Sequence, residues 1–176
     1  QDGNTSRLKS VVRIIETRQK NYKTGKINPK NIKIICIIPV RGKTQKLFGK
    51  HQIYYTIKAA LRSKFINEIY VSTDSKKTAK IAKSLGANCP FIRPSKLSDP
   101  HINIETVQKY SLKKIEQKGL LPDLVVHLEE TFPFRSYEII DEMITRLLQE
   151  GYDTVIAARR ETGSMWYEDT KKNFRR

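Results

Sequence analysis

The chain has 176 residues, of which 34 are Lys or Arg and 18 are Asp or Glu, so its formal net charge is +16. Hydrophobic residues make up 38% of the sequence, which excludes a wholly disordered chain and is enough for the core of one compact domain. The longest uninterrupted apolar run, residues 34–38, is far shorter than the roughly 20 residues that a membrane span needs, and no apolar secretion signal opens the sequence. We therefore expect a cytoplasmic protein without a membrane anchor.

The positive charge is concentrated near the start of the sequence. Residues 1–50 contribute +11 and residues 51–176 contribute +5. A basic arm is typical of contacts with nucleic acid, because Lys and Arg release counterions from phosphate chains. A solvated basic surface is the competing interpretation, and the spread of lysine through the later segments favours it. A nucleic-acid-binding protein is therefore kept only as a less favoured alternative.

Residues 1–31 form a segment distinct from the rest. Apolar residues between Thr5 and Gln19 recur at roughly helical spacing, and the polar stretch that follows contains Gly25 and Pro29. This pattern predicts a short basic helix and a linker over residues 1–31, followed by a domain over residues 32–176.

Strands and helices alternate through the domain. Residues 32–38 form a nearly continuous apolar run, which predicts a strand buried on both faces at the centre of a parallel sheet. The later elements are expected as strands at 66–72, 88–92, 123–128 and 154–157, and as helices at 54–61, 76–85, 105–118 and 136–150. This alternation predicts a three-layer α/β fold with a mostly parallel sheet. Cys36 and Cys89 lie in apolar runs and are expected to be buried thiols.

The loop after the central strand is a candidate anion site, because ligands of open α/β sheets collect at the carboxyl ends of the strands. Residues 40–50 carry four cations, two glycines and no acid, which suits a nucleoside triphosphate. Gly42-Lys43-Thr44 lacks the earlier glycine of a P-loop, so a Walker-type ATPase is disfavoured.

Five short motifs at strand ends follow one another at characteristic spacings. They are Pro39-Val40-Arg41-Gly42, Gly49-Lys50 with Tyr55-Thr56-Ile57, Val71-Ser72-Thr73-Asp74, Arg93-Pro94 with Leu97-Ser98-Asp99, and Thr131 with Pro133-Phe134-Arg135. In this order they resemble the acylneuraminate cytidylyltransferase family, the CMP-sialic acid synthetases and their relatives for legionaminic and pseudaminic acids. The last motif of that family reads Leu-Gln-Pro-Thr-Ser-Pro-Leu-Arg. The resemblance covers roughly residues 33–158.

The resemblance implies a nucleotide-diphospho-sugar transferase fold, which is Rossmann-like, and transfer of CMP from CTP to an acidic nonulosonic sugar with release of pyrophosphate. It also implies Mg²⁺ as cofactor and a homodimer. Such a reaction depends on positive charge along the triphosphate more than on acid or base groups. The family pattern continues beyond Arg176 with metal-binding aspartates and a dimerisation arm, so no metal ligand is assigned within this sequence.

The resemblance also implies roles for individual residues. Arg41 matches the arginine that contacts the triphosphate, with Val40 and Gly42 as its backbone neighbours. Lys43 and Lys46 stand in the same loop and complete the expected catalytic set.

Three further residues are expected at the nucleotide. Arg93 matches an arginine of the nucleotide pocket, Asn103 falls where the family has a serine near the cytosine, and Glu129 replaces the glutamine of the last motif. For Arg135 a surface ion pair is an equal alternative to a motif role, and Asp74 is expected to cap the following helix rather than bind metal.

Two departures from the family pattern leave an alternative function open. The loop between Arg41 and Tyr55 is shortened, so that either Lys43 and Lys46 replace the missing phosphate ligands or activity has been lost. Glu129 cannot donate a hydrogen bond as an amide does, and it would repel phosphate. The alternative is a catalytically degenerate nucleotide-binding or regulatory module of the same fold.

Overall fold

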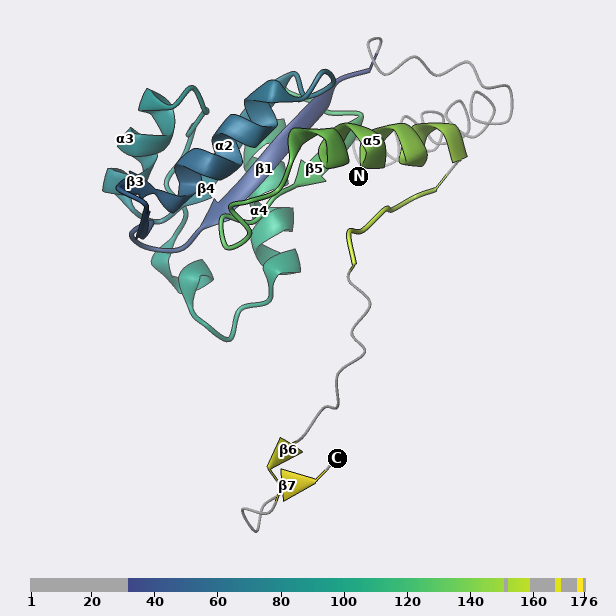
Figure 1. Ribbon diagram of the computed structural model, residues 1–176. Coiled ribbons are helices and arrows are strands. Elements are labelled where there is room, and N and C mark those ends of the chain that lie inside the picture. Colours follow the sequence, from purple (N-terminus) through teal and green to yellow (C-terminus); the bar gives the residue numbers. More distant parts are fainter. Residues whose placement is uncertain (1–31, 151, 159–166, 169–173, 176) are drawn as a thin grey trace, which may run out of the picture.

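The computed structural model describes residues 32–150, 152–158, 167–168 and 174–175 (Figure 1). The expected helix and linker at residues 1–31 lie outside the described residues. Among the residues described, no helix is long and apolar enough to cross a membrane.

A parallel sheet of three strands forms the centre of the domain. β1 (Ile34–Val40) lies between β4 (Glu68–Thr73) and β5 (Leu124–His127), and both pairs are parallel. The apolar run of β1 is at most 1% exposed from Ile34 to Ile38, because helices cover both of its faces. The prediction of a buried central strand is therefore confirmed.

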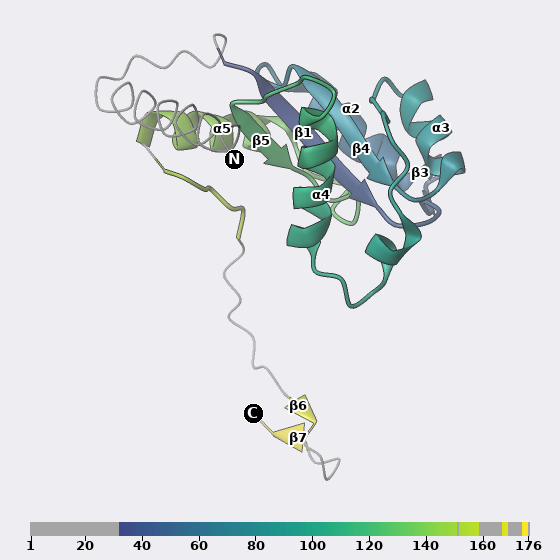
Figure 2. The ribbon, with the colours of Figure 1, turned by 180° about the vertical axis from the view of Figure 1, so that it is seen from behind.

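Helices pack on the two faces of this sheet. α2 (Gln52–Arg62), α3 (Lys76–Ser84) and α5 (Tyr137–Glu150) share one apolar cluster with alternate residues of β1, including Ile34 and Ile38. On the other face α4 (Ile104–Glu116) packs Ile115 against Ile35 and Ile37 (Figure 2). The predicted three-layer α/β architecture is confirmed.

Two expected strands are wrong. Residues 88–92 make only a single bridge, between Asn88 and Tyr70, because Pro90 has no N–H to continue a ladder. Residues 154–157 form no strand, and Ile156 is 77% exposed. No described strand lies beside them, and an extended segment without a hydrogen-bonded neighbour does not form a sheet.

Several short elements were not anticipated. β2 (Lys46–Leu47) and β3 (Lys50–His51) form an antiparallel hairpin inside the basic loop. A 3₁₀ turn, η2 (Ser95–Ser98), follows Arg93. β6 (Tyr167–Glu168) and β7 (Phe174–Arg175) pair antiparallel.

Both cysteines are free and buried, as predicted. Cys36 lies on β1, where burial raises the pKa of its thiol far above the ordinary value. A thiol in this state is a small apolar core group, not a nucleophile.

Candidate active site

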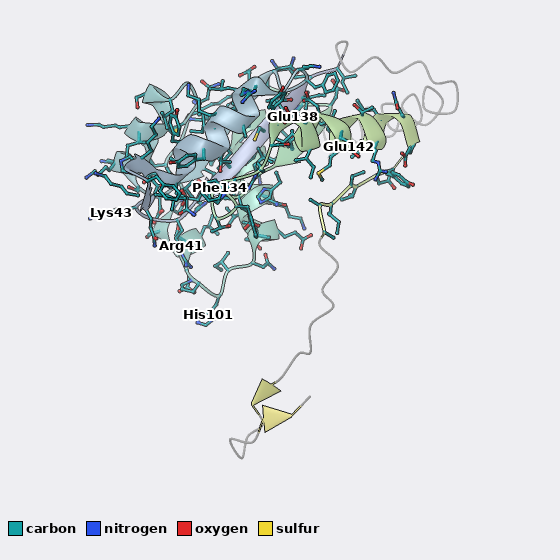
Figure 3. All side chains as sticks on the ribbon, viewed as in Figure 1. Arg41, Lys43, His101, Phe134, Glu138 and Glu142 are labelled. Atoms are coloured by element: carbon teal, nitrogen blue, oxygen red, sulfur yellow. The ribbon has the colours of Figure 1, made fainter. Side chains whose placement is uncertain are left out.

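The candidate site lies at the carboxyl end of the sheet, where the loops after β1, β4 and β5 meet. In Figure 3, Arg41 and Lys43 lie at the end of the domain where β1 finishes, and Glu138 and Glu142 lie along α5. Parallel pairing places the last residues of β1 and β4 side by side, with Val40 opposite Thr73. The loops that follow the strands therefore converge without any further requirement on the sequence.

The backbone of the turn after β1 is held by two hydrogen bonds to side chains. Gly42 adopts φ +62°, a conformation that favours glycine, and its N–H donates to Asp74 Oδ1 at 2.8 Å. Its carbonyl oxygen accepts from Thr78 Oγ1 at 2.7 Å. With both backbone groups of Gly42 bonded to protein, anion binding at this turn falls to the side chains of Arg41 and Lys43.

Asp74 therefore does not cap the following helix, and that expectation is wrong. Ser75 is the N-cap of α3, and its Oγ accepts from Thr78 N at 3.2 Å. Asp74 lies one residue too early for this position, and its carboxylate is turned to the Gly42 N–H. Its role in the structure is to hold the turn that carries Arg41.

The side chains of Arg41, Lys43 and Lys46 are exposed, and none of them pairs with an acid among the described residues. Lys46 belongs to the β2–β3 hairpin, while Arg41 and Lys43 precede it. Their charge is left free for a ligand. Burial lowers the pKa of Arg93, the charge of Asp74 opposes this effect, and the like charge of Arg41 adds a smaller lowering.

Arg93 lies beneath this turn and is only 3% exposed. Its Nη1 donates to the Ser72 carbonyl at 2.9 Å, its Nη2 to the Val40 carbonyl at 3.3 Å, and its Nε to Ser98 Oγ at 3.2 Å. The guanidinium thus ties together the ends of β4 and β1 and the η2 turn. The donors of Arg93 already have protein partners. A direct contact between Arg93 and a nucleotide stays a prediction.

Asn103 is the N-cap of α4, where its Oδ1 accepts from Thr106 N at 2.9 Å. Within the part of the chain that the structure describes, no hydrogen bond joins Asn103 to the Arg41 turn. The expected place of Asn103 near a cytosine remains a prediction.

The loop after β5 is closed by Arg135, which donates to the carbonyl oxygens of Glu129 and Phe132. Of the two alternatives for Arg135, the surface ion pair is not seen among the described residues, and its donors bind backbone acceptors of its own loop. The Glu129 carboxylate is half-exposed and accepts from Thr131 Oγ1 at 3.1 Å, and it lies 3.9 Å from His127 Nε2. Burial lowers the pKa of His127, and the Glu129 charge opposes this effect.

Sequence reasoning missed the contact that joins the basic loop after β1 to the loop after β5. Thr44 Oγ1 donates to Glu130 Oε2 at 2.6 Å, although the residues are 86 positions apart. Thr44 is 6% exposed and also accepts from Ile53 N at 3.2 Å, at the start of α2. The only signal in the sequence is a threonine inside a basic loop, which does not identify its partner.

An exposed aromatic cluster adjoins this contact. The rings of Phe48 and Phe134 lie 6.1 Å apart and are 79% and 70% exposed, and Tyr55 lies 5.8 Å from Phe134. Phe48 adopts φ +48°, which is unfavourable for a bulky side chain. The cluster shows again that the hairpin and the loop after β5 are neighbours.

The described residues do not fit a metal ion held by the protein. No group of three or more His, Cys, Asp or Glu side chains among them could hold one. Asp74, the carboxylate nearest the Arg41 turn, already accepts the Gly42 N–H. No step below is therefore routed through a metal ion.

Comparison with known proteins agrees with this geometry. The chain matches the cytidylyltransferase family over residues 35–175. A pseudaminic acid cytidylyltransferase of Campylobacter jejuni is 27% identical over 135 residues, which cover 72% of this chain and 58% of that protein. The CMP-N,N'-diacetyllegionaminic acid synthase of Legionella pneumophila is 35% identical over 117 residues, 62% of this chain and 50% of that protein. The chain spans about half the length of these curated relatives.

Two solved structures share the fold. One is a 4-diphosphocytidyl-2C-methyl-D-erythritol synthase from Anaerococcus prevotii, with a TM-score of 0.55 and 20% identity over 84% of this chain and 64% of that chain. The other is a CMP:2-keto-3-deoxy-manno-octonic acid synthetase complexed with CTP, with a TM-score of 0.54 and 15% identity over 65% of this chain and 47% of that chain. The predicted nucleotidyltransferase fold is confirmed. By its match over most of its length, the chain belongs to the cytidylyltransferase family.

Proposed function

We propose that the protein transfers CMP from CTP to an acidic nonulosonic sugar of the sialic, legionaminic or pseudaminic acid type, with release of pyrophosphate. One observation carries the proposal: a cationic turn without ion-pair partners among the described residues stands at the carboxyl end of the central strand. Ligands of such sheets bind at this end. The names of the Campylobacter and Legionella relatives support the substrate class.

In the proposed reaction a hydroxyl oxygen of the sugar forms a bond to the α-phosphorus of CTP. The bond from that phosphorus to the bridging oxygen breaks, pyrophosphate leaves with the electron pair, and the hydroxyl proton passes to solvent. Arg41, Lys43 and Lys46 would bind the triphosphate and stabilise the charge that develops on the leaving group. Arg41 is suited to paired contacts with phosphate oxygens because of its planar fork of donors.

The remaining predicted contacts divide into two kinds. Val40, Gly42 and Arg93 support the turn, since the Val40 carbonyl binds Arg93 and both backbone groups of Gly42 are bonded. Asn103 and Glu129 would border the nucleotide on either side. The Glu129 carboxylate would lie nearer the hydroxyl groups of a ligand than its phosphates, because like charges repel.

The proposal also includes Mg²⁺ as cofactor, a homodimer as the assembly and the cytoplasm as the location. Mg²⁺ commonly binds through substrate phosphates with only one or two carboxylates, so CTP itself would supply most of its ligands. The two buried free thiols are compatible with a reducing compartment.

A second candidate function is CTP binding without turnover. It is favoured by the shortened loop and by Glu129, which stands where the family pattern has a glutamine. The same turn would then serve a regulatory or scaffolding role.

The test is a pyrophosphate assay with CTP, Mg²⁺ and a panel of nonulosonic acids, run beside calorimetric titration with CTP. We expect pyrophosphate only when both CTP and a suitable acid are present, and none with ATP or after addition of EDTA. CTP binding with no pyrophosphate from any acid would establish the second function. No CTP binding at all would overturn both.

A further inference from the structure

Thr44 and Glu130 form a short hydrogen bond between two loops at the candidate site. The hydroxyl–carboxylate distance is 2.6 Å, within the range of charge-assisted hydrogen bonds. The side chain of His51, at the N-cap position of α2, makes no capping hydrogen bond. The Thr44 hydroxyl oxygen instead accepts the Ile53 N–H at 3.2 Å and so satisfies one free donor at the start of this helix. One side chain therefore connects the basic loop, the start of α2 and the loop after β5.

The surroundings of Glu130 make this contact costly to lose. Burial raises the pKa of Glu130, while the hydrogen bond from Thr44 and the nearby charge of His51 lower it. A partly buried carboxylate is stabilised mainly by its hydrogen-bond donors, and Thr44 is the donor that the structure provides. Without it, the loop after β5 would have to move to hydrate the carboxylate.

Both partners occur where the chain departs from the family pattern. Glu130 stands at the second position after Leu128, where the pattern has proline, which has no side-chain acceptor. Thr44 lies in the shortened loop. A shorter loop has fewer contacts to hold it in place, and a hydrogen bond to a neighbouring loop supplies one.

We propose that Thr44 and Glu130 are positioning residues that hold the basic loop against the loop after β5 and so keep Arg41 and Lys43 in the orientation that binds the triphosphate. This inference rests on the proposed function. Neither side chain needs to touch CTP. Small displacements of binding groups are enough to weaken a site that depends on orientation.

The experiment compares Thr44→Val, Thr44→Ser and Glu130→Gln with a matched control, Ser63→Ala. Ser63 Oγ also donates to a carboxylate at 2.6 Å, that of Asp141, across 78 positions, but at the other end of α2. Thr44→Val keeps the buried volume and removes the hydroxyl. The readouts are the Kd of CTP by calorimetry, KM and kcat, the Tm, and hydrogen exchange of the amides of residues 41–45 without ligand.

We expect Thr44→Val to weaken CTP binding about tenfold and to speed amide exchange in residues 41–45. Thr44→Ser keeps the hydroxyl and should bind CTP with wild-type affinity. Glu130→Gln should weaken CTP binding by an intermediate factor, because its amide oxygen still accepts the hydrogen bond. Ser63→Ala should lower Tm without changing CTP affinity or exchange in the loop.

Two outcomes overturn the inference. In the first, Thr44→Val lowers Tm as Ser63→Ala does and leaves CTP affinity, KM and loop exchange unchanged, so that the contact is only structural. In the second, Thr44→Ser fails to restore affinity. If the wild type binds no CTP, the proposed function fails first, and normal loop exchange in Thr44→Val would then reject the positioning role separately.

Discussion

The two ends of the parallel sheet are built differently. At the amino end three polar contacts join the strands and helices: Lys33 Nζ bonds Glu68, Lys33 N donates to Asp123 Oδ2 at 2.8 Å, and Ser63 bonds Asp141. At the carboxyl end Arg41 and Lys43 have no acidic partner among the described residues. Like charges gathered in one loop suit a ligand of opposite charge.

A cavity lies at the opposite end of the sheet from the candidate site. This cavity, of about 750 Å³, lies at the amino end between the last turns of α3 and α4, and Glu68, Lys83 and Lys118 are among its lining residues. The carboxylate of Glu68 already accepts hydrogen bonds from Lys33 and Tyr70. The comparison teaches that the clustering of four cations without an acid in residues 40–50, rather than a cavity, distinguishes the candidate site.

The strongest test of the comparison removes the buried arginine of the carboxyl end. Arg93→Met should cost about 3 kcal/mol or more of unfolding free energy, because it removes the buried guanidinium donors to the carbonyls of Ser72 and Val40 and to the hydroxyl of Ser98. The expected fall in Tm is about 10 °C. Urea and thermal unfolding followed by circular dichroism measure both quantities. A stable Arg93→Met variant would show that the ends of β1 and β4 do not depend on this side chain.

The next effect is on binding. Arg41→Ala should weaken CTP binding about 10- to 100-fold, the usual contribution of a charged hydrogen bond, and should leave Tm unchanged because the side chain is exposed. Calorimetry and thermal unfolding separate the two quantities. Lys76→Ala, on the exposed side of α3, is the matched control for lost charge. Equal effects of the two variants would reduce the role of Arg41 to net charge.

A smaller effect is expected at the amino end. Ser63→Ala should cost about 1 kcal/mol, or about 2–4 °C in Tm, since Asp141 still accepts from Lys64 N at 3.2 Å. CTP affinity should stay that of the wild type. If affinity falls with stability, the two ends of α2 are coupled and the distinction between them fails.

The smallest effect is on pH dependence, and its sign differs between the two ends. Hydrogen bonds from Lys33 and Tyr70 hold the pKa of Glu68 below its ordinary value, so its contribution to stability is lost as pH falls through that lowered pKa. Burial raises the pKa of Glu130, so its contribution is present at low pH and is lost as pH rises through the raised pKa.

Urea midpoints measured between about pH 4 and pH 7 test these signs. Relative to wild type, Glu68→Gln should flatten the loss of stability on the acid side, and Glu130→Gln should flatten the loss as pH rises. Changes of the same sign in both variants would contradict the opposite environments of the two carboxyls.

The sequence predicted the frame of the molecule well. Residues 34–38 form the buried central strand, Ser136 and Glu138 begin α5, and Gly86, at φ +97°, follows α3. These features depend on periodicity and on backbone preferences, which act over a few neighbouring residues. The expected strand at 154–157 failed because a strand needs a partner that local preference cannot supply.

For the candidate site, the sequence by itself determined which residue types follow the central strand: a cationic turn with a glycine at positive φ and no acid. Only the tertiary structure decided what surrounds that turn. It buried Arg93 beneath Val40, turned Asp74 to Gly42 instead of α3, and joined Thr44 to Glu130 across 86 residues. The physical reason is that a polar side chain takes its partner from whichever segment the packed layers bring within about 3 Å, and that segment is set by chain topology rather than by local sequence.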